Sequence, residues 1–223
     1  MGYPTILHLH IPRTAGSSVH AVLGAYAKTN GVTLVTSSHA QVAAEITKLD
    51  APPALITGHF AFGLHTLVPN PFYFIVMRDP VERVASLIRF IMSRPEHAKH
   101  ALVSACNGDP QKIYRQRKRG GQFDNGATRQ LSGSFAPGYI WPWRRRRALQ
   151  ALQGRPAKVV VTTPQRLRHG LDRLGAELGF SFADPEIHNA CTGDMPSEAA
   201  RHVIAAHNRI DAEFYRRVAE QDE

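Results

Sequence analysis

The 223-residue sequence is poor in cysteine and has no long apolar run, and each shortage excludes a class of protein. Its two cysteines, Cys106 and Cys191, lie far apart and outside any CxxC spacing, so neither a disulfide framework nor a zinc site is expected. No stretch approaches the roughly 20 apolar residues of a membrane-spanning helix, and residues 1–6 lack the pattern of a signal peptide. We therefore expect a soluble, cytoplasmic protein without a membrane span.

Acidic residues are scarce relative to basic ones. Lys and Arg number 27 against 18 Asp and Glu, which gives a formal net charge of +9. Such a surface favours an anionic partner, namely a nucleotide, a nucleic acid, an acidic glycan or an anionic membrane. The 43% hydrophobic content excludes a disordered chain, and no repeat or flexible linker divides the sequence. A single domain over residues 1–223 is expected.

Short β-favouring runs alternate along the chain with amphipathic helical patterns. Strands are expected at residues 6–11, 54–57, 72–77 and 157–161. Helices are expected at residues 19–28, 80–93, 164–178 and 196–220, the last with a short interruption. This alternation is typical of an α/β fold with a parallel sheet covered on both faces. Ligands of such sheets bind at the carboxyl ends of the strands, so the loops that follow them matter most.

The loop after the first predicted strand has the composition of an anion site. It reads His10-Ile11-Pro12-Arg13-Thr14-Ala15-Gly16-Ser17-Ser18. Its small residues let backbone amides approach a phosphate, its hydroxyl groups can donate to one, and Arg13 adds a fixed positive charge. The nucleotide-triphosphatase pattern G-x-x-x-x-G-K-[ST] is missing, because no lysine follows Gly16. Taken alone, the segment fits a tight turn with a serine cap equally well.

The loop after the apolar strand at 72–77 carries a second candidate phosphate site. Arg78 follows the strand directly, and Asp79 and Pro80 form a helix cap and first helical position. Arg83 and Ser86 then share one face of the helix, and arginine with a hydroxyl group suits a phosphate. The structural alternatives are an ion pair from Arg78 to a neighbouring carboxylate and a hydroxyl group of Ser86 on the helix surface.

Together the two loops, H-I-P-R-T-A-G-S-S and R-D-P-x-x-R-x-x-S, resemble the sulfotransferases that use 3′-phosphoadenosine 5′-phosphosulfate. The likeness is greatest to the branch of the heparan and uronyl 2-O-sulfotransferases and their bacterial relatives. It implies a P-loop-like, three-layer fold with a central parallel sheet of four to five strands. It also implies that the first loop binds the 5′-phosphosulfate and the second the 3′-phosphate. The expected ligands are Arg13, Thr14, Ala15, Gly16, Ser17 and Ser18, with Arg78 and Ser86.

Two further segments extend the resemblance over most of the chain. Residues 56–60 look like the G-H segment that supplies a histidine base, which implies that His59 is catalytic. Residues 125–133 are similar to the N-x-x-T-R-x-L-S-G stretch that closes over the cofactor, which implies a contact from Arg129. The family usually has lysine where Arg13 stands. Arginine can stabilise charge on the leaving phosphate but, being permanently charged, cannot deliver a proton.

The other histidines of these segments are weaker candidates. His65 is a reserve for the base, and His8 and His10 are expected to pack in the core or support the site. No His/Asp/Glu cluster has metal-ligand spacing, so no metal is expected.

Two basic runs, 115–119 and 144–147, fit either solvated helix faces or a rim that attracts an anionic acceptor. Trp141 and Trp143, just before the second run, could stack on adenine or on a sugar ring.

The resemblance implies transfer of a sulfuryl group from 3′-phosphoadenosine 5′-phosphosulfate to a hydroxyl acceptor on a carbohydrate, such as an anionic glycan, or on a small metabolite. One alternative is a nucleotide-dependent kinase, which the missing lysine and the lack of an acidic magnesium ligand after a strand disfavour. Another is a basic nucleotide- or nucleic-acid-binding protein without catalysis. No nucleic-acid partner is expected, because the sequence has no zinc finger or RNP-type aromatic motif. Neither the acceptor nor the oligomeric state follows from the sequence.

Overall fold

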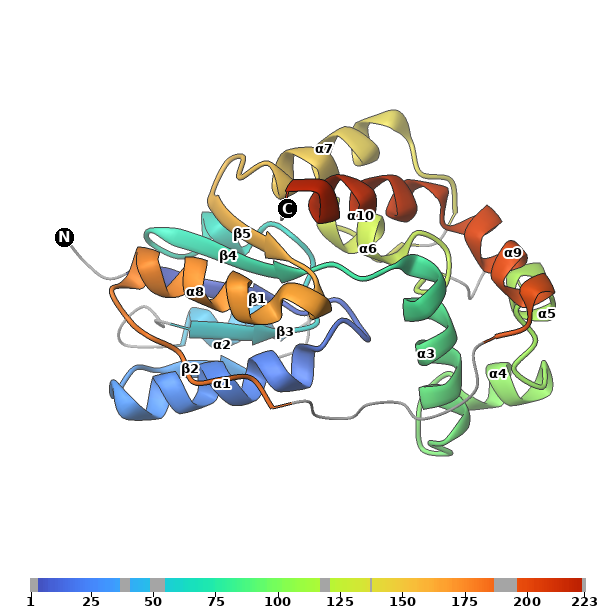
Figure 1. Ribbon diagram of the computed structural model, residues 1–223, viewed down its shortest axis with the longest axis horizontal. Coiled ribbons are helices and arrows are strands. Elements are labelled where there is room, and N and C mark those ends of the chain that lie inside the picture. Colours follow the sequence, from blue (N-terminus) through green and yellow to red (C-terminus); the bar gives the residue numbers. More distant parts are fainter. Residues whose placement is uncertain are drawn as a thin grey trace.

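A five-stranded parallel sheet forms the centre of the protein in a computed structural model that describes residues 4–36, 41–48, 55–116, 121–136, 138–186 and 196–221 (Figure 1). The strands are β1 (Thr5–Leu9), β2 (Leu34–Thr36), β3 (Leu55–Gly58), β4 (Pro71–Val76) and β5 (Lys158–Thr162). Their order in the sheet is β2-β3-β1-β4-β5, and every neighbouring pair is parallel. The predicted α/β class, with a central parallel sheet of four to five strands flanked by helices, is confirmed.

Helices cover both faces of the sheet because the strands alternate apolar side chains between them. In β1, Ile6 packs with α1 (Gly16–Thr29) and α8 (Leu167–Leu178), whereas Leu7 faces the opposite core. On that opposite face lie α2 (Val42–Ile46), α6 (Gly126–Leu131), α7 (Pro142–Leu152) and α10 (Arg209–Gln221). The result is a three-layer arrangement with one apolar core on each side of the sheet.

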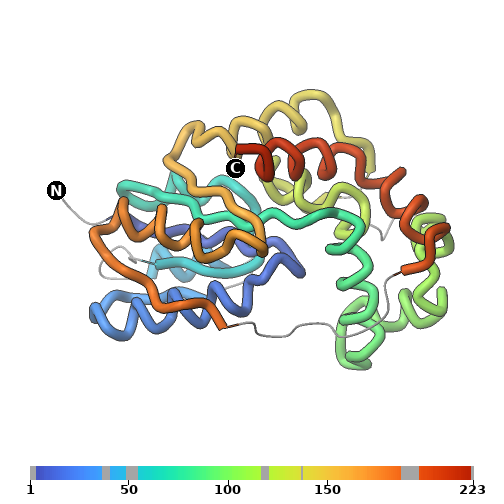
Figure 2. Tube along the Cα trace, in the orientation of Figure 1, coloured from blue at the N-terminus to red at the C-terminus, as the bar shows by residue number. Residues whose placement is uncertain are grey.

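A third apolar cluster lies beyond the carboxyl ends of the strands, around α3 (Pro80–Met92). It includes residues of α4 (His100–Ala105), α5 (Pro110–Arg115) and α9 (Glu198–His207). Asp79 caps α3 by accepting hydrogen bonds from the amides of Val81 and Glu82, as the sequence predicted. Figure 2 shows that the loop after β1 and the start of α3 both lie at this edge of the sheet.

The predicted elements are present with small shifts at their ends. The expected helix at 164–178 is a 3₁₀ turn (Pro164–Arg166) followed by α8, and the interruption expected in the last helix falls at Asn208, between α9 and α10. The sequence missed β2 and the helices α2, α4, α5, α6 and α7, as well as a 3₁₀ turn at Leu64–Thr66. These segments are short or lack a clear apolar stripe, so their periodicity is weak.

Cys106 is a buried free thiol, as expected, whereas Cys191 and residues 117–119 of the first basic run lie outside the described residues. None of the helices in the described ranges combines the length and the apolar character that a membrane crossing requires.

Candidate active site

The loop between β1 and α1 turns sharply through two residues in the left-handed region. The φ angles of Arg13 and Ala15 are 69° and 66°. Between them Thr14 is buried, and its hydroxyl group donates to the carbonyl of Ile11 at 2.8 Å. Left-handed residues in a tight loop turn backbone N–H groups toward one side, where they attract an anion, and the start of the 14-residue α1 adds its dipole. The backbone is therefore shaped for an anion, but the hydroxyl of Thr14 is used inside the turn rather than as the expected ligand.

Gly16, the first residue of α1, leaves room for the ring of His10. A Cβ atom at position 16 would lie 1.7 Å from Nε2 of His10, well inside any tolerated contact. The imidazole thus rests directly on the backbone of the loop, and it also stacks on His59 with ring centroids 4.2 Å apart. Glycine is required at position 16 because the ring of His10 lies so close to the backbone, and not because of the φ angle of Gly16.

Replacing Gly16 by alanine is expected to lower the free energy of unfolding by about 1–3 kcal/mol, the usual cost of overpacking. Gly24→Ala is the matched control in the same helix, because a Cβ there meets nothing within 4 Å and should stabilise by about 0.5–1 kcal/mol. In a His10→Ala background, Gly16→Ala should cost nothing further. Urea unfolding of the four variants measures this, and an equal cost in both backgrounds would contradict the assigned contact.

The two predicted phosphate loops meet at the carboxyl edge of the sheet. Nε of Arg13 donates to the hydroxyl oxygen of Ser86 at 3.0 Å, and Nη1 of Arg78 donates to the carbonyl oxygen of Arg13 at 3.3 Å. Arg78 also forms the ion pair with Glu82 that the sequence offered as an alternative, at 3.2 Å. The guanidinium group of Arg13 lies over the ring of Phe90, 4.7 Å from its centroid. The fold therefore joins segments that are 73 residues apart in sequence.

A cavity of about 930 Å³ opens between these loops, which is within the usual size range of ligand sites. Seven predicted cofactor ligands line it: Arg13, Ala15, Gly16, Ser17, Ser18, Arg78 and Ser86. His59, the expected base, also lines the cavity, as does His10, whose ring stacks on that of His59. Five arginines contribute to the walls against two carboxylates, so the cavity attracts anions.

His59 follows β3 and is exposed to this cavity. Its Nδ1 atom lies 2.8 Å from the carbonyl oxygen of His10. A carbonyl oxygen can only accept, so Nδ1 carries the proton and Nε2 of the neutral ring is left as an acceptor. Gln130 donates to the same carbonyl oxygen at 3.0 Å, and to that of Phe60 at 2.9 Å. The geometry fixes the ring in the tautomer that a general base needs.

The other three candidate histidines, His8, His10 and His65, lie in different surroundings. His8 is buried and its Nδ1 lies 2.8 Å from the hydroxyl oxygen of Thr57, so its role is to pack and support, as expected. His10 lines the cavity itself, whereas the sequence indicated a core or supporting position. The reserve base His65 lies instead against Tyr73, with 3.1 Å between its Nδ1 and the phenol oxygen, and is not among the residues that line the cavity.

The buried His8 and the half-buried His10 should make the protein less stable in mild acid. Burial, together with the charges of neighbouring histidines, lowers the pKa of His8 to about 3 and that of His10 to about 2. Below pH 6.5 the unfolded chain therefore binds protons that the folded protein does not. Stability should fall as the pH drops from about 6.5 toward 4.5, by roughly 1 kcal/mol per pH unit for each histidine.

Urea unfolding at about pH 7, 6 and 5 measures this dependence. His10→Asn should make it shallower, whereas His202→Asn, which removes an exposed histidine of α9, should leave it unchanged. Identical slopes for the wild type and His10→Asn would contradict the assignment.

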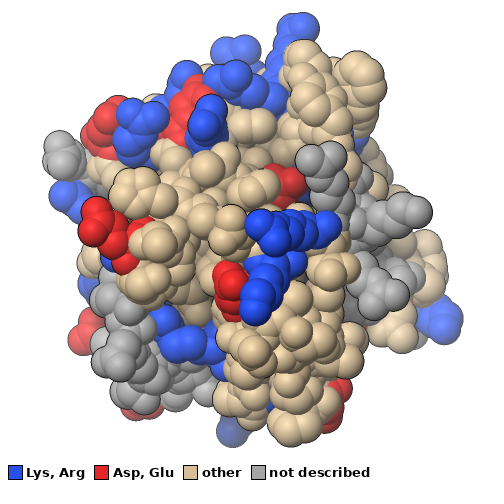
Figure 3. Space-filling model, turned by 90° about the vertical axis from the view of Figure 1, so that its right-hand side faces the viewer, with Lys and Arg blue, Asp and Glu red and all other residues tan. Residues whose placement is uncertain are grey.

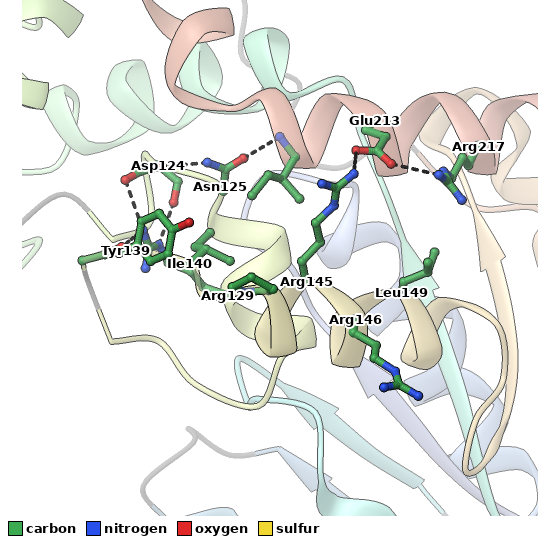
Figure 4. Close-up of a pocket in the computed structure, with 13 residues that line it drawn as sticks. Asp124, Asn125, Arg129, Tyr139, Ile140, Arg145, Arg146, Leu149, Glu213 and Arg217 are labelled. Atoms are coloured by element: carbon green, nitrogen blue, oxygen red, sulfur yellow. Dashed lines mark hydrogen bonds and ion pairs between the residues drawn. The ribbon is translucent and has the colours of Figure 1, made fainter.

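Arg129, for which the resemblance implies a cofactor contact, is not among the residues that line this cavity. Its guanidinium group is buried and donates to the carbonyl oxygens of Asp124, Ala136 and Gly138 at 2.8, 2.8 and 2.6 Å. It also pairs with the carboxylate of Asp124 at 3.1 Å. The residue borders a second cavity, of about 660 Å³, between α6, α7 and α10 (Figure 4). Arg129 thus holds a loop together instead of contacting a ligand in the first cavity.

Arg83 is likewise internal. It is buried, donates to the carbonyl oxygen of Gln122 at 3.2 Å, and lies 3.5 Å from the carboxylate of Asp211 on α10. Burial lowers the pKa of Arg83, and the charge of Asp211 opposes that effect. The same carboxylate accepts hydrogen bonds from the amides of Ala127 and Thr128 at the start of α6. The segment at 125–133, which resembles a cofactor-closing stretch, is therefore anchored to α10. Its Gln130 contacts the carbonyl oxygen of His10, which lines the cavity.

Several residues that line the cavity were not foreseen, and three of them are arginines. On and just after α3, Arg89 and Arg94 line the cavity one and two turns beyond Ser86, and Arg168 approaches from α8. The helical spacing from Ser86 was the available signal for the first two. Conversely, the cavity is not lined by Trp141 or Trp143, which the sequence offered for stacking on adenine or a sugar ring, nor by residues 144–147, which it offered as a basic rim.

Within the described residues, no group of three or more His, Cys, Asp or Glu side chains has the arrangement of a metal site. No protein-family profile matches the sequence, and no curated protein matches it significantly.

Proposed function

We propose that this protein transfers a sulfuryl group from 3′-phosphoadenosine 5′-phosphosulfate to a hydroxyl acceptor. One observation carries the proposal: the two loops that resemble those of sulfotransferases meet across one cationic cavity, with Arg13 bonded to Ser86. Two phosphate-type sites on one cavity suit a nucleotide that is charged at both ends. A nucleotide with a single polyphosphate chain has no use for the second site.

The first loop supplies the groups for the 5′ end of the nucleotide. Backbone amides at the start of α1 and the side chains of Ser17 and Ser18 can donate to the phosphosulfate. The second loop supplies Arg78 and Ser86 for the 3′-phosphate. Nothing in this assignment needs the hydroxyl of Thr14 or the guanidinium group of Arg129.

His59 then acts as the general base. Its Nε2 atom accepts the proton of the acceptor hydroxyl as the new oxygen–sulfur bond forms. The bond between sulfur and the bridging oxygen breaks, and the electron pair stays on the phosphate of the nucleotide product. Arg13 stabilises the charge that develops on that phosphate. Because arginine keeps its proton, the leaving group departs as an anion.

The acceptor is proposed to be a hydroxyl group on a carbohydrate or a small metabolite. The excess of arginine in the cavity favours an acceptor that carries negative charge, such as an anionic glycan. The nucleotide assignment does not use Arg89, Arg94 and Arg168, which also line the cavity and are the arginines left to attract such an acceptor.

Competitive binding tests the proposal. 3′-Phosphoadenosine 5′-phosphate should bind more tightly than ATP with or without magnesium, and Arg78→Ala should weaken its binding roughly 10- to 150-fold, the cost of a lost hydrogen bond to a charged group. Arg201→Ala, which removes an exposed arginine of α9, is the control and should change affinity less than about twofold. Magnesium-dependent preference for ATP would support a kinase instead, and tighter binding of DNA or RNA would support a nucleic-acid-binding protein.

A further inference from the structure

Three large aromatic side chains stand exposed within five residues at the start of α7. The exposed fractions of Tyr139, Trp141 and Trp143 are 70%, 58% and 58%. Soluble proteins seldom leave such a cluster in water without a use for it. With the neighbouring exposed Arg146 and Arg147, these three residues are called here the aromatic–arginine surface. None of these residues lines the cavity to which the nucleotide and the base His59 are assigned.

Two buried arginines fix the loop that leads into this surface. Arg129 donates to the carbonyl oxygens of Ala136 and Gly138, and Arg144 donates to that of Ser134 at 2.7 Å. Burial lowers the pKa of Arg144, as does the nearby charge of Arg129, so placing two cations under one loop is costly. Fixing the loop in advance lowers the entropy cost of binding through its aromatic residues.

The charge of the surface is positive. Trp143 has Arg146 and Arg147 three and four residues further along α7, which places them beside it on the helix. Arg145 turns the other way and pairs with Glu213 of α10, whereas Arg146 points away from that pair (Figure 4). In the view of Figure 3 many basic side chains, with a few acidic ones among them, lie along the upper edge of the molecule, the side on which α7 and α10 lie in Figure 1.

We propose that the aromatic–arginine surface binds the protein peripherally to an anionic lipid bilayer. Tryptophan and tyrosine are amphipathic and favour the headgroup region, and arginine binds lipid phosphates. A sugar chain fits less well, because the rings of Tyr139 and Trp141 meet edge-on, with 86° between their planes, and do not offer parallel faces for stacking. A bilayer interface imposes no such alignment. The proposal is independent of the nucleotide chemistry.

Intrinsic fluorescence tests the proposal directly, because both tryptophans of the chain lie on this surface. Vesicles of about 30% phosphatidylglycerol in phosphatidylcholine should shift the emission to the blue and carry the full chain into the pellet on centrifugation. Vesicles of phosphatidylcholine alone should do neither, and about 0.5 M salt should weaken the association. The variants Trp141→Phe and Trp143→Phe each leave one reporter, and both should show the shift.

Vesicle sedimentation with two double variants separates the contribution of the tryptophans to membrane binding from that of the arginines. Trp141→Ser/Trp143→Ser should lower the partition coefficient at least about tenfold, whereas Leu67→Ser, at another exposed apolar residue, should not. Arg146→Ser/Arg147→Ser should also lower it about tenfold and reduce its salt dependence.

Lys28→Ser/Lys48→Ser removes the same charge elsewhere on the surface and should lower the partition coefficient less than threefold. Three results would overturn the proposal. They are no binding to anionic vesicles, binding that the aromatic and arginine variants leave unchanged, and a fluorescence shift with soluble heparin or with self-association but not with vesicles.

Discussion

Replacing His59 by alanine is expected to lower turnover of the proposed sulfuryl transfer by about 10²- to 10⁴-fold, the usual contribution of a general base. The acceptor hydroxyl then loses its proton acceptor, since Nε2 is the free nitrogen of a ring whose Nδ1–H is bound to the carbonyl of His10. The dissociation constant of 3′-phosphoadenosine 5′-phosphate should change less than about threefold, because His59 is not assigned to either phosphate. Steady-state kinetics and calorimetric titration measure the two quantities separately.

His65→Ala is the matched control for that experiment. His65 also follows β3, but its ring lies against Tyr73 and is not among the residues that line the cavity. Its turnover should stay within about threefold of the wild type. Unchanged turnover in His59→Ala would remove this residue from the mechanism, even if the nucleotide still binds.

Replacing Asp211 by alanine is expected to lower the free energy of unfolding by about 3–5 kcal/mol. Its carboxylate is the counterion of the buried Arg83, at 3.5 Å, and accepts hydrogen bonds from the amides of Ala127 and Thr128 and from the hydroxyl group of Thr128. Its loss leaves a buried cation unpaired and the first turn of α6 uncapped. Thermal unfolding should show a decrease in Tm on the order of 10 °C.

Glu213→Ala provides the comparison two residues further along α10. Glu213 forms ion pairs with Arg145 and Arg217 at the surface, where such pairs contribute about 1 kcal/mol or less. The two variants remove the same charge, so a difference between them isolates the effect of burial. Equal losses of stability would show that the network around Asp211 does not organise α6, and would contradict the role assigned to it.

The sheet was predictable because its strands carry strong local signals. The run at 72–77 is apolar at every position, and a parallel strand buried on both faces demands that pattern. The edge strand β2 (Leu34–Thr36) was missed, since three residues are too few to establish a period. Helix α6 was missed for another reason. It is capped by a carboxylate 83 residues away, and no local pattern records that contact.

In the candidate site, too, the sequence placed some residues correctly and others not. Seven of the predicted ligands line one cavity, because each follows a parallel strand and the carboxyl ends of parallel strands lie at one edge of a sheet. Arg129 was misplaced, since an exposed arginine and a buried one that binds carbonyl oxygens look alike in a motif. His10 was underrated, because its position against Gly16 depends on how the loop folds back on the strand.

The amino-acid order alone determined four of the five strands, the position of a loop with the composition of an anion site, and the positive net charge. Those features arise from interactions between residues near one another in the chain. The tertiary structure decided the tautomer of His59, the pairing of Arg13 with Ser86, and the outward projection of Trp141. Each depends on a contact or a burial set by segments distant in sequence. A local sequence pattern cannot predict such contacts, because the same type of side chain can bind a ligand, bind a loop carbonyl or face solvent, depending on the residues that pack beside it.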